Sequence, residues 1–168
     1  MNILKEKNWI ESYCGEVGDL LKNSKVQEMK NYPHHGKIST HFHSVYVSYI
    51  VYKASVKMGA DARSIVRASL LHDLYLYDWH TTKHEEKHAW YHPKAAVKNI
   101  EKYKVSDLTP MQRDMILSHM WPLHKTPPNS VGGFLLTWAD KYCADRELLY
   151  HAKGFIPVYN EILRRGEN

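Results

Sequence analysis

The dipeptide His72-Asp73 is the strongest chemical signal in this chain of 168 residues. It stands near the end of the mostly apolar segment ASLLHDL, so that an imidazole and a carboxylate are delivered side by side into apolar surroundings. Burying such groups is costly unless a partner compensates them. A divalent cation is such a partner, because it binds neutral imidazole and ionised carboxylate together. Pairs of this kind are usually structural, so a metal site needs the support of further residues.

His43 lies on the apolar face of a helix that the sequence predicts over residues 40–58. Val47 and Ile50 follow His43 at helical spacing and mark the face expected to lie in the core. Tyr46 falls on another side, which we expect to face water. A histidine at such a position is either a core residue whose ring nitrogens have hydrogen-bond partners or a metal ligand that points into the interior.

Three more polar residues stand at the ends of apolar stretches or helices. His119 closes the run MILSH, and Asp140 follows the segment GGFLLTWA, which contains almost no other polar side chain. A carboxylate in that position needs a partner. His92 stands at an expected helix start, where it is either a capping or surface residue or a ligand. A shared role as metal ligands would explain why polar side chains stand at all of these positions.

The order His43, His72-Asp73, Asp140 resembles the HD-domain superfamily of metal-dependent phosphohydrolases. The segments that look like its signatures are ADARSIVRASLLHDLYLYDW and WADKYCADRE. His92 within HPKAA and His119 within ILSHM are similar to the branch of that superfamily with two metals. The resemblance covers about residues 38–150.

The resemblance implies an all-α bundle whose ligands lie on facing helices around one polar pocket. It implies that the first of two divalent metals is held by His43, His72, Asp73 and Asp140. Asp73, which would also be a catalytic residue, would bridge to a second metal held by His92 and His119. A ligand set of nitrogen and oxygen atoms suits Fe, Mn, Co, Ni or Zn and does not choose between them.

Two such ions about 3.5–4 Å apart can clamp the attacking and leaving oxygens of a phosphoester and supply hydroxide near neutral pH. We therefore expect a hydrolase that acts on a small phosphoester, with nucleotides among the candidates. The chain lacks the GYP-type segment of cyclic-di-nucleotide phosphodiesterases, which argues against such a substrate. Two alternatives stay open: a mixed-valent di-iron oxygenase with the same ligands, and a non-catalytic regulator that binds metal or nucleotide.

Other residues near the signature segments are candidates for contact with the substrate. Lys141 and Arg146 are predicted to bind phosphate, although each can also belong to a solvated face. His80 and His124 lie in predicted loops near the ligands and are candidates for general acid catalysis or for orienting the substrate. Aromatic residues in the same loops either line a pocket or pack in the core.

The hydrophobic pattern predicts an all-α single domain over residues 1–168. The first 30 residues are expected to be helical, with the helix interrupted or weakened at Gly15 and Gly18. Further helices are expected over the ranges 40–58, 61–74, 92–103, 109–119 and 132–150, with a short last one from residue 157. Pro93 is expected at the first position of its helix, which leaves residues 75–91 as a loop.

The composition narrows the class of protein further. Twelve histidines are the clearest departure from ordinary usage, and histidine is the commonest metal ligand. The net charge is +5, but no cluster of basic residues with interleaved aromatics stands out, so we expect no nucleic-acid partner. No apolar run is long enough for a membrane span, and the charged N-terminus does not resemble a signal peptide. The two cysteines fit a reduced, cytoplasmic setting.

Overall fold

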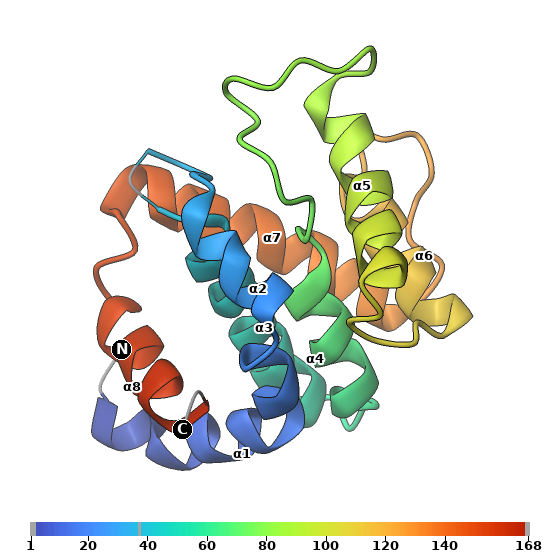
Figure 1. The fold of residues 1–168 in the computed structure, drawn as a ribbon. Coiled ribbons are helices and arrows are strands. Elements are labelled where there is room, and N and C mark those ends of the chain that lie inside the picture. The colour runs from blue at the N-terminus through green and yellow to red at the C-terminus, as the bar shows by residue number, and fades with distance from the viewer. Residues whose placement is uncertain (1–2, 37, 167–168) are drawn as a thin grey trace.

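Helix α3 (Thr40–Lys57) runs through the interior of the protein, which is described here by a computed structural model covering residues 3–36 and 38–166 (Figure 1). Nearly all of its side chains are buried as far as Tyr52. The expectation that Tyr46 faces water is therefore wrong. Its ring stacks on Phe155 at a centroid distance of 4.2 Å, because a segment beyond α7 covers the side of α3 that was expected to be wet.

The other helices surround α3. Helices α4 and α7 pack directly against it, α6 packs on α4 and α7, α5 packs on α6, and α8 packs on α1 at the opposite end of the molecule (Figure 1). Their bounds are α1 (Ile3–Leu21), α2 (Ser24–Glu28), the 3-10 helix η1 (Met29–Asn31), α4 (Ala62–Leu71), α5 (His88–Lys102), α6 (Pro110–Ser118), α7 (Val131–Tyr150) and α8 (Ile156–Gly166). Within the described ranges the only β-type pairing is an isolated bridge between Pro33 and Ser39. The predicted all-α single-domain class is confirmed.

Side-chain caps fix where the helices that carry the predicted site begin. Asp61 accepts a hydrogen bond from the backbone N–H of Ser64 at 3.1 Å and starts α4, as the sequence predicts. Helix α4 ends at Leu71, three residues earlier than predicted, because tight turns follow in which Leu74 N–H donates to the carbonyl of Leu71. The dipeptide His72-Asp73 therefore lies in a turn just beyond the helix.

Helix α1 is continuous, and the predicted interruption at Gly15 and Gly18 is wrong. A stripe of buried residues that includes Ile10, Tyr13 and Val17 holds α1 against the rest of the core. Packing of such an apolar stripe outweighs the weak helix propensity of two glycines.

Helix α5 starts at His88 rather than at His92, so the predicted position of Pro93 is wrong as well. Pro93 lies inside the helix, after a first turn in which the N–H groups of Trp90 and Tyr91 donate to the carbonyl of Lys87. The helix tolerates this proline because it lies near the N-terminal end, where few backbone bonds are lost.

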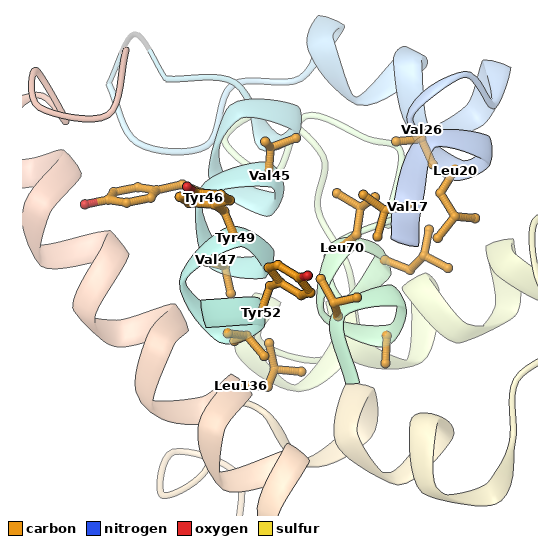
Figure 2. Packing of buried hydrophobic residues seen from close by; sticks show 14 of the residues in the cluster. Val17, Leu20, Val26, Val45, Tyr46, Val47, Tyr49, Tyr52, Leu70 and Leu136 are labelled. Atoms are coloured by element: carbon orange, nitrogen blue, oxygen red, sulfur yellow. The ribbon is translucent and has the colours of Figure 1, made fainter. Parts of the chain in front are cut away.

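The core joins the N-terminal and central helices into one packed unit. Figure 2 shows buried side chains from several helices, among them Val17 of α1, Val47 of α3, Leu70 of α4 and Leu136 of α7. Among the described helices, none is both long enough and apolar enough to cross a membrane.

The close approach of α7 to α4 and α6 provides a test of this packing. A Cβ atom added at Gly132 would lie 2.8 Å from Cγ1 of Ile65 and 3.0 Å from Sδ of Met115, both of which are buried. We predict that Gly132→Ala lowers the free energy of unfolding by about 1–3 kcal/mol through overpacking.

The matched control is Gly15→Ala on α1, where an added Cβ meets no atom within 4 Å. This variant should instead raise the free energy of unfolding by about 0.5–1 kcal/mol, since alanine favours the helix. Urea titrations of both variants measure the difference, and equal stability of the two would contradict the packing described here.

Candidate metal centre

Five separate segments bring the six predicted metal ligands into one cluster. His43 comes from α3, His92 from α5 and Asp140 from α7, whereas His72-Asp73 lies in the turn after α4 and His119 ends α6. All the histidines and Asp73 are buried, and Asp140 is partly buried. Two groups among them could hold a metal ion: His43, His72 and Asp140, and His72, Asp73 and His119.

Backbone carbonyls orient three of the four histidines. The Nδ1 atom of each lies close to a carbonyl oxygen three or four residues earlier, at 2.8 Å for His72, 2.9 Å for His92 and 2.6 Å for His119. A carbonyl oxygen can only accept a hydrogen bond, so Nδ1 carries the proton in each ring. When the rings are neutral, their Nε2 atoms present lone pairs to the cluster, which is the arrangement that metal-binding histidines use. Burial acts to lower the pKa of His72, but Asp73 and Asp140 outweigh it and raise this pKa, so a metal ion bound there also displaces a proton.

A buried carboxylate orients the fourth histidine. Nδ1 of His43 lies 3.0 Å from both carboxylate oxygens of Glu147, and Nε2 lies 3.0 Å from Oδ1 of Asp140. Burial alone would lower the pKa of His43, but Glu147 and Asp140 outweigh it and raise this pKa well above its ordinary value. A metal ion that takes Nε2 of His43 as a ligand therefore has to displace a proton.

The carboxylate of Asp73 lies between two groups of histidines. Its Oδ1 atom is 3.3 Å from Nε2 of His92 and 3.8 Å from Nε2 of His119. Its Oδ2 atom is 3.5 Å from Nε2 of His72 and 4.0 Å from Nε2 of His43. Burial acts to raise the pKa of Asp73, but the surrounding histidines, His72 and His92 foremost, hold it well below its usual range.

The cluster contains polar atoms that protein groups do not satisfy. The Nε2 atoms of His92 and His119 lie 2.9 Å apart. Burial lowers the pKa of both rings, that of His119 to about 3, so that two lone pairs face each other near neutral pH. Among the described side chains, Nε2 of His72 and Oδ1 of Asp73 are buried without a hydrogen-bond partner. A cation removes both problems, so this donor set fits a metal ion.

A cavity of about 240 Å³ opens onto the cluster. Its lining contains two carboxylates and five histidines, which are Asp73, Asp140, His34, His35, His88, His92 and His119. The apolar part of the lining consists of Trp79, Met120, Leu123 and Ala144. Lys141 is the basic side chain in the lining. Its Nζ atom donates hydrogen bonds to the carbonyls of His119 (3.2 Å) and Thr137 (3.4 Å), and burial lowers its pKa, against the influence of Asp140. Lys141 is thus placed to meet an anionic group in the cavity.

Arg146, the second residue predicted to contact phosphate, lies elsewhere. Its guanidinium stands 5.2 Å from the ring centroid of Tyr142 and 5.1 Å from that of Tyr150, and it lines a different cavity together with Lys153. Its role in binding phosphate stays a prediction.

His80 and His124 also lie apart from the lining of the metal-centre cavity. His80 is exposed, and its Nδ1 lies 3.1 Å from Oδ1 of Asp78. His124 lines a separate cavity of about 350 Å³ with Trp90 and Lys94. The proposed role of both histidines in proton transfer or substrate orientation stays a prediction.

Glu147, His34 and His35 also belong to the cluster, and none of them is among the ligands expected from the sequence. Glu147 stands seven positions after Asp140, which is two helical turns along the same face of α7, so helical spacing could have identified it. His34 lies in the segment between η1 and α3, with Nδ1 3.7 Å from Oδ2 of Asp73. No periodic pattern covers that segment, so the sequence carried no comparable signal for His34.

The pairing of Glu147 with His43 gives a prediction about metal affinity. Glu147→Gln removes the charge that orients His43, and we expect the affinity for a divalent metal to fall about 10–100-fold, as is usual when such a partner is lost. Titration of the metal-depleted protein with Mn²⁺ or Co²⁺ measures the effect. Asp145→Asn, which alters an exposed carboxylate on the same helix, is the control and should leave the affinity unchanged. Equal affinities for both variants would contradict this role of Glu147.

Comparisons of the chain with protein-family models, with curated proteins and with solved structures find no match. The function is therefore argued from the geometry of the cluster and its cavity.

Proposed function

We propose that the protein is a metal-dependent phosphohydrolase with an HD-type fold that acts on a small phosphoester. The observation that carries this proposal is the position of Asp73, which turns one carboxylate oxygen toward His92 and His119 and the other toward His72 and His43. A carboxylate shared in this way suits a bridge between two cations. Sites with two metals are common in enzymes that cleave phosphoesters.

The arrangement of the helices supports the HD-type assignment. The first histidine lies in α3, the His72-Asp73 pair follows α4, and Asp140 lies in α7, which packs on α3. The two additional histidines come from the adjacent helices α5 and α6. This order and this spatial arrangement are what the resemblance implies for the branch with two metals.

The residues of the cluster would hold divalent ions, which supply Lewis acidity and make water acidic enough to yield hydroxide near neutral pH. The chain itself provides the orientation of the donors, because backbone carbonyls and Glu147 fix the imidazole rings before any ion binds. It also provides an apolar part of the cavity lining, which includes Met120 and Leu123.

The cavity favours a compact substrate. Its volume of about 240 Å³ lies below the range of about 300–1,000 Å³ that is usual for ligand sites. Lys141 would bind the phosphoryl oxygens, and Trp79, which also lines the cavity, would contact the body of the substrate. A phosphate monoester of a small alcohol fits these features better than a long dinucleotide does.

Hydrolysis assays after metal loading test the proposal. The metal-depleted protein is reconstituted with Mn²⁺, Co²⁺, Ni²⁺ or Fe²⁺ and assayed with p-nitrophenyl phosphate, bis-p-nitrophenyl phosphate and a panel of natural phosphate monoesters. We predict metal-dependent release of phosphate that falls to background in Asp73→Ala, because this variant loses the shared carboxylate. Asp107→Ala, in an exposed loop, should keep the activity of the unaltered protein.

Two results would contradict this function. Activity that survives in Asp73→Ala would show that hydrolysis occurs elsewhere. Turnover that needs both iron and O₂, in the absence of any phosphate release, would favour oxygenase chemistry at the same residues.

The position of Lys141 gives a prediction about substrate binding. Lys141→Met should raise KM for a phosphate monoester about 10-fold or more with a smaller change in kcat, because a contact used equally in ground and transition states affects KM. Lys141→Arg should restore part of the loss, and Lys153→Met, in the cavity beside Arg146, should have no effect. Steady-state kinetics measure all three variants, and an unchanged KM in Lys141→Met would remove this lysine from the proposed site.

A further inference from the structure

The segment that precedes α3 carries His34 to the metal cluster and fixes its backbone. The N–H of His34 donates to the carbonyl of Ile38 at 2.8 Å, and its own carbonyl accepts a hydrogen bond from the indole Nε1 of Trp79 at 3.2 Å. The bridge between Pro33 and Ser39 closes the same segment. His34 is therefore held by contacts on both sides, so its side chain has a defined place.

The ring of His34 is buried against the cluster. Its centroid lies 4.0 Å from that of His43 at an interplanar angle of 31°, and its Nδ1 atom lies 3.7 Å from Oδ2 of Asp73. Donor atoms of His34, His43 and Asp73 all fall within 4.8 Å of one another. Because metal–donor bonds of this kind measure about 2.1 Å, two donors to one ion lie at most about 4.2 Å apart. The separations of Oδ2 of Asp73 from His34 (3.7 Å) and from His43 (4.0 Å) meet that limit.

His34 differs from the other histidines in the use of its Nδ1 atom. In His72, His92 and His119 this atom donates to a backbone carbonyl, whereas in His34 it faces the carboxylate of Asp73 and the hydroxyl of Tyr75, at 3.3 Å. A structural histidine could use Nδ1 to accept a hydrogen bond from Tyr75.

The hydroxyl of Tyr75 does not depend on His34, however. It has a closer partner in Oγ1 of Thr40, at 3.0 Å. The lone pair of His34 Nδ1 can therefore be given to a cation while Tyr75 keeps a hydrogen bond.

The two oxygens of Asp73 divide the donors into unequal groups. Oδ1 faces His92 and His119. Oδ2 faces His72, His43 and His34. Asp140 lies on the same side, with its Oδ1 atom 3.0 Å from Nε2 of His43 and 3.8 Å from Nε2 of His72. We propose that His34 is an additional ligand of the ion held by His43, His72, Asp73 and Asp140, so that this position has five protein donors and the other has three. The inference rests on the metal centre proposed above and not on phosphoester hydrolysis.

The unequal donor groups have a functional consequence. Residues of both donor groups line the cavity, His34 and Asp140 on one side and His92 and His119 on the other. An ion with five protein donors nevertheless keeps few coordination positions free, whereas an ion with three keeps several open, as catalytic metal sites do. The position beside His92 and His119 would thus receive water and substrate. The position beside His34 would bind its ion more tightly and would serve mainly to fix Asp73.

Metal titration of the full chain tests the role of His34 without any assay of activity. Metal-depleted protein is titrated with Co²⁺, the visible absorption bands are recorded, and the bound metal is counted by elemental analysis. We expect two classes of site in the unaltered protein. In His34→Ala the tighter class should weaken about 10-fold or more, and its absorption bands should change because they respond to the number of donors.

Two control variants separate ligation from packing of the segment. His151→Ala removes an exposed histidine outside this segment, and Tyr75→Phe removes the other partner of His34 Nδ1. Both should keep the affinity and the spectrum of the unaltered protein. Thermal unfolding of each metal-depleted variant checks that the fold is intact.

The outcomes distinguish this inference from the proposed metal centre. If the unaltered protein binds no Co²⁺, both are overturned. If it binds Co²⁺ and His34→Ala matches it in affinity and spectrum, the ligand role of His34 alone is overturned. If Tyr75→Phe reproduces the loss seen in His34→Ala, the histidine acts through packing of the segment, and its ligand role is again overturned.

Discussion

The convergence of buried imidazole nitrogens and carboxylate oxygens on Asp73 is the constraint on which the structure of this protein centres. Backbone carbonyls hold the protons of His92 and His119 on Nδ1, so the Nε2 lone pairs of these two rings point at one another and at the carboxylate. Without a cation, two buried hydrogen-bond acceptors face each other, because Nε2 of His92 lies 2.9 Å from Nε2 of His119. Such a cluster is costly unless bound metal offsets the repulsion.

The ends of the helices position several of these groups. His72 and His119 each stand directly after the last residue of a helix, where the chain turns and the ring reaches back to a carbonyl of its own helix. Helix α3 crosses the interior and carries His43, while α7 contributes both Asp140 and the carboxylate of Glu147 that orients His43. The buried core around α3 fixes these elements, so the donors are arranged before any ion binds.

Helical periodicity predicted the all-α class. The apolar surroundings of His43, His72-Asp73, His119 and Asp140 marked them as polar side chains that need a partner, and the resemblance to the HD-domain superfamily added His92 and joined the six residues into one set. Prediction from the sequence failed where tertiary packing overrides a local rule. Pro93 indicated a helix start, yet α5 begins earlier because its first turn bonds to Lys87. Amphipathic spacing assumes that one side of a helix is exposed, and on that assumption Tyr46 faces water. Helix α3 has almost no exposed side as far as Tyr52, so the expectation fails. His34 lies in a segment without periodicity, so only the folded chain reveals its distance to Asp73.

Anomalous X-ray scattering from crystals grown with Mn²⁺ or Co²⁺ would locate bound metal at this cluster. We predict strong anomalous peaks within bonding distance of the Asp73 carboxylate, one on the side of His92 and His119 and one on the side of His72 and His43. Crystals that take up no metal at this cluster, or that bind it only at surface carboxylates, would contradict the proposed metal centre.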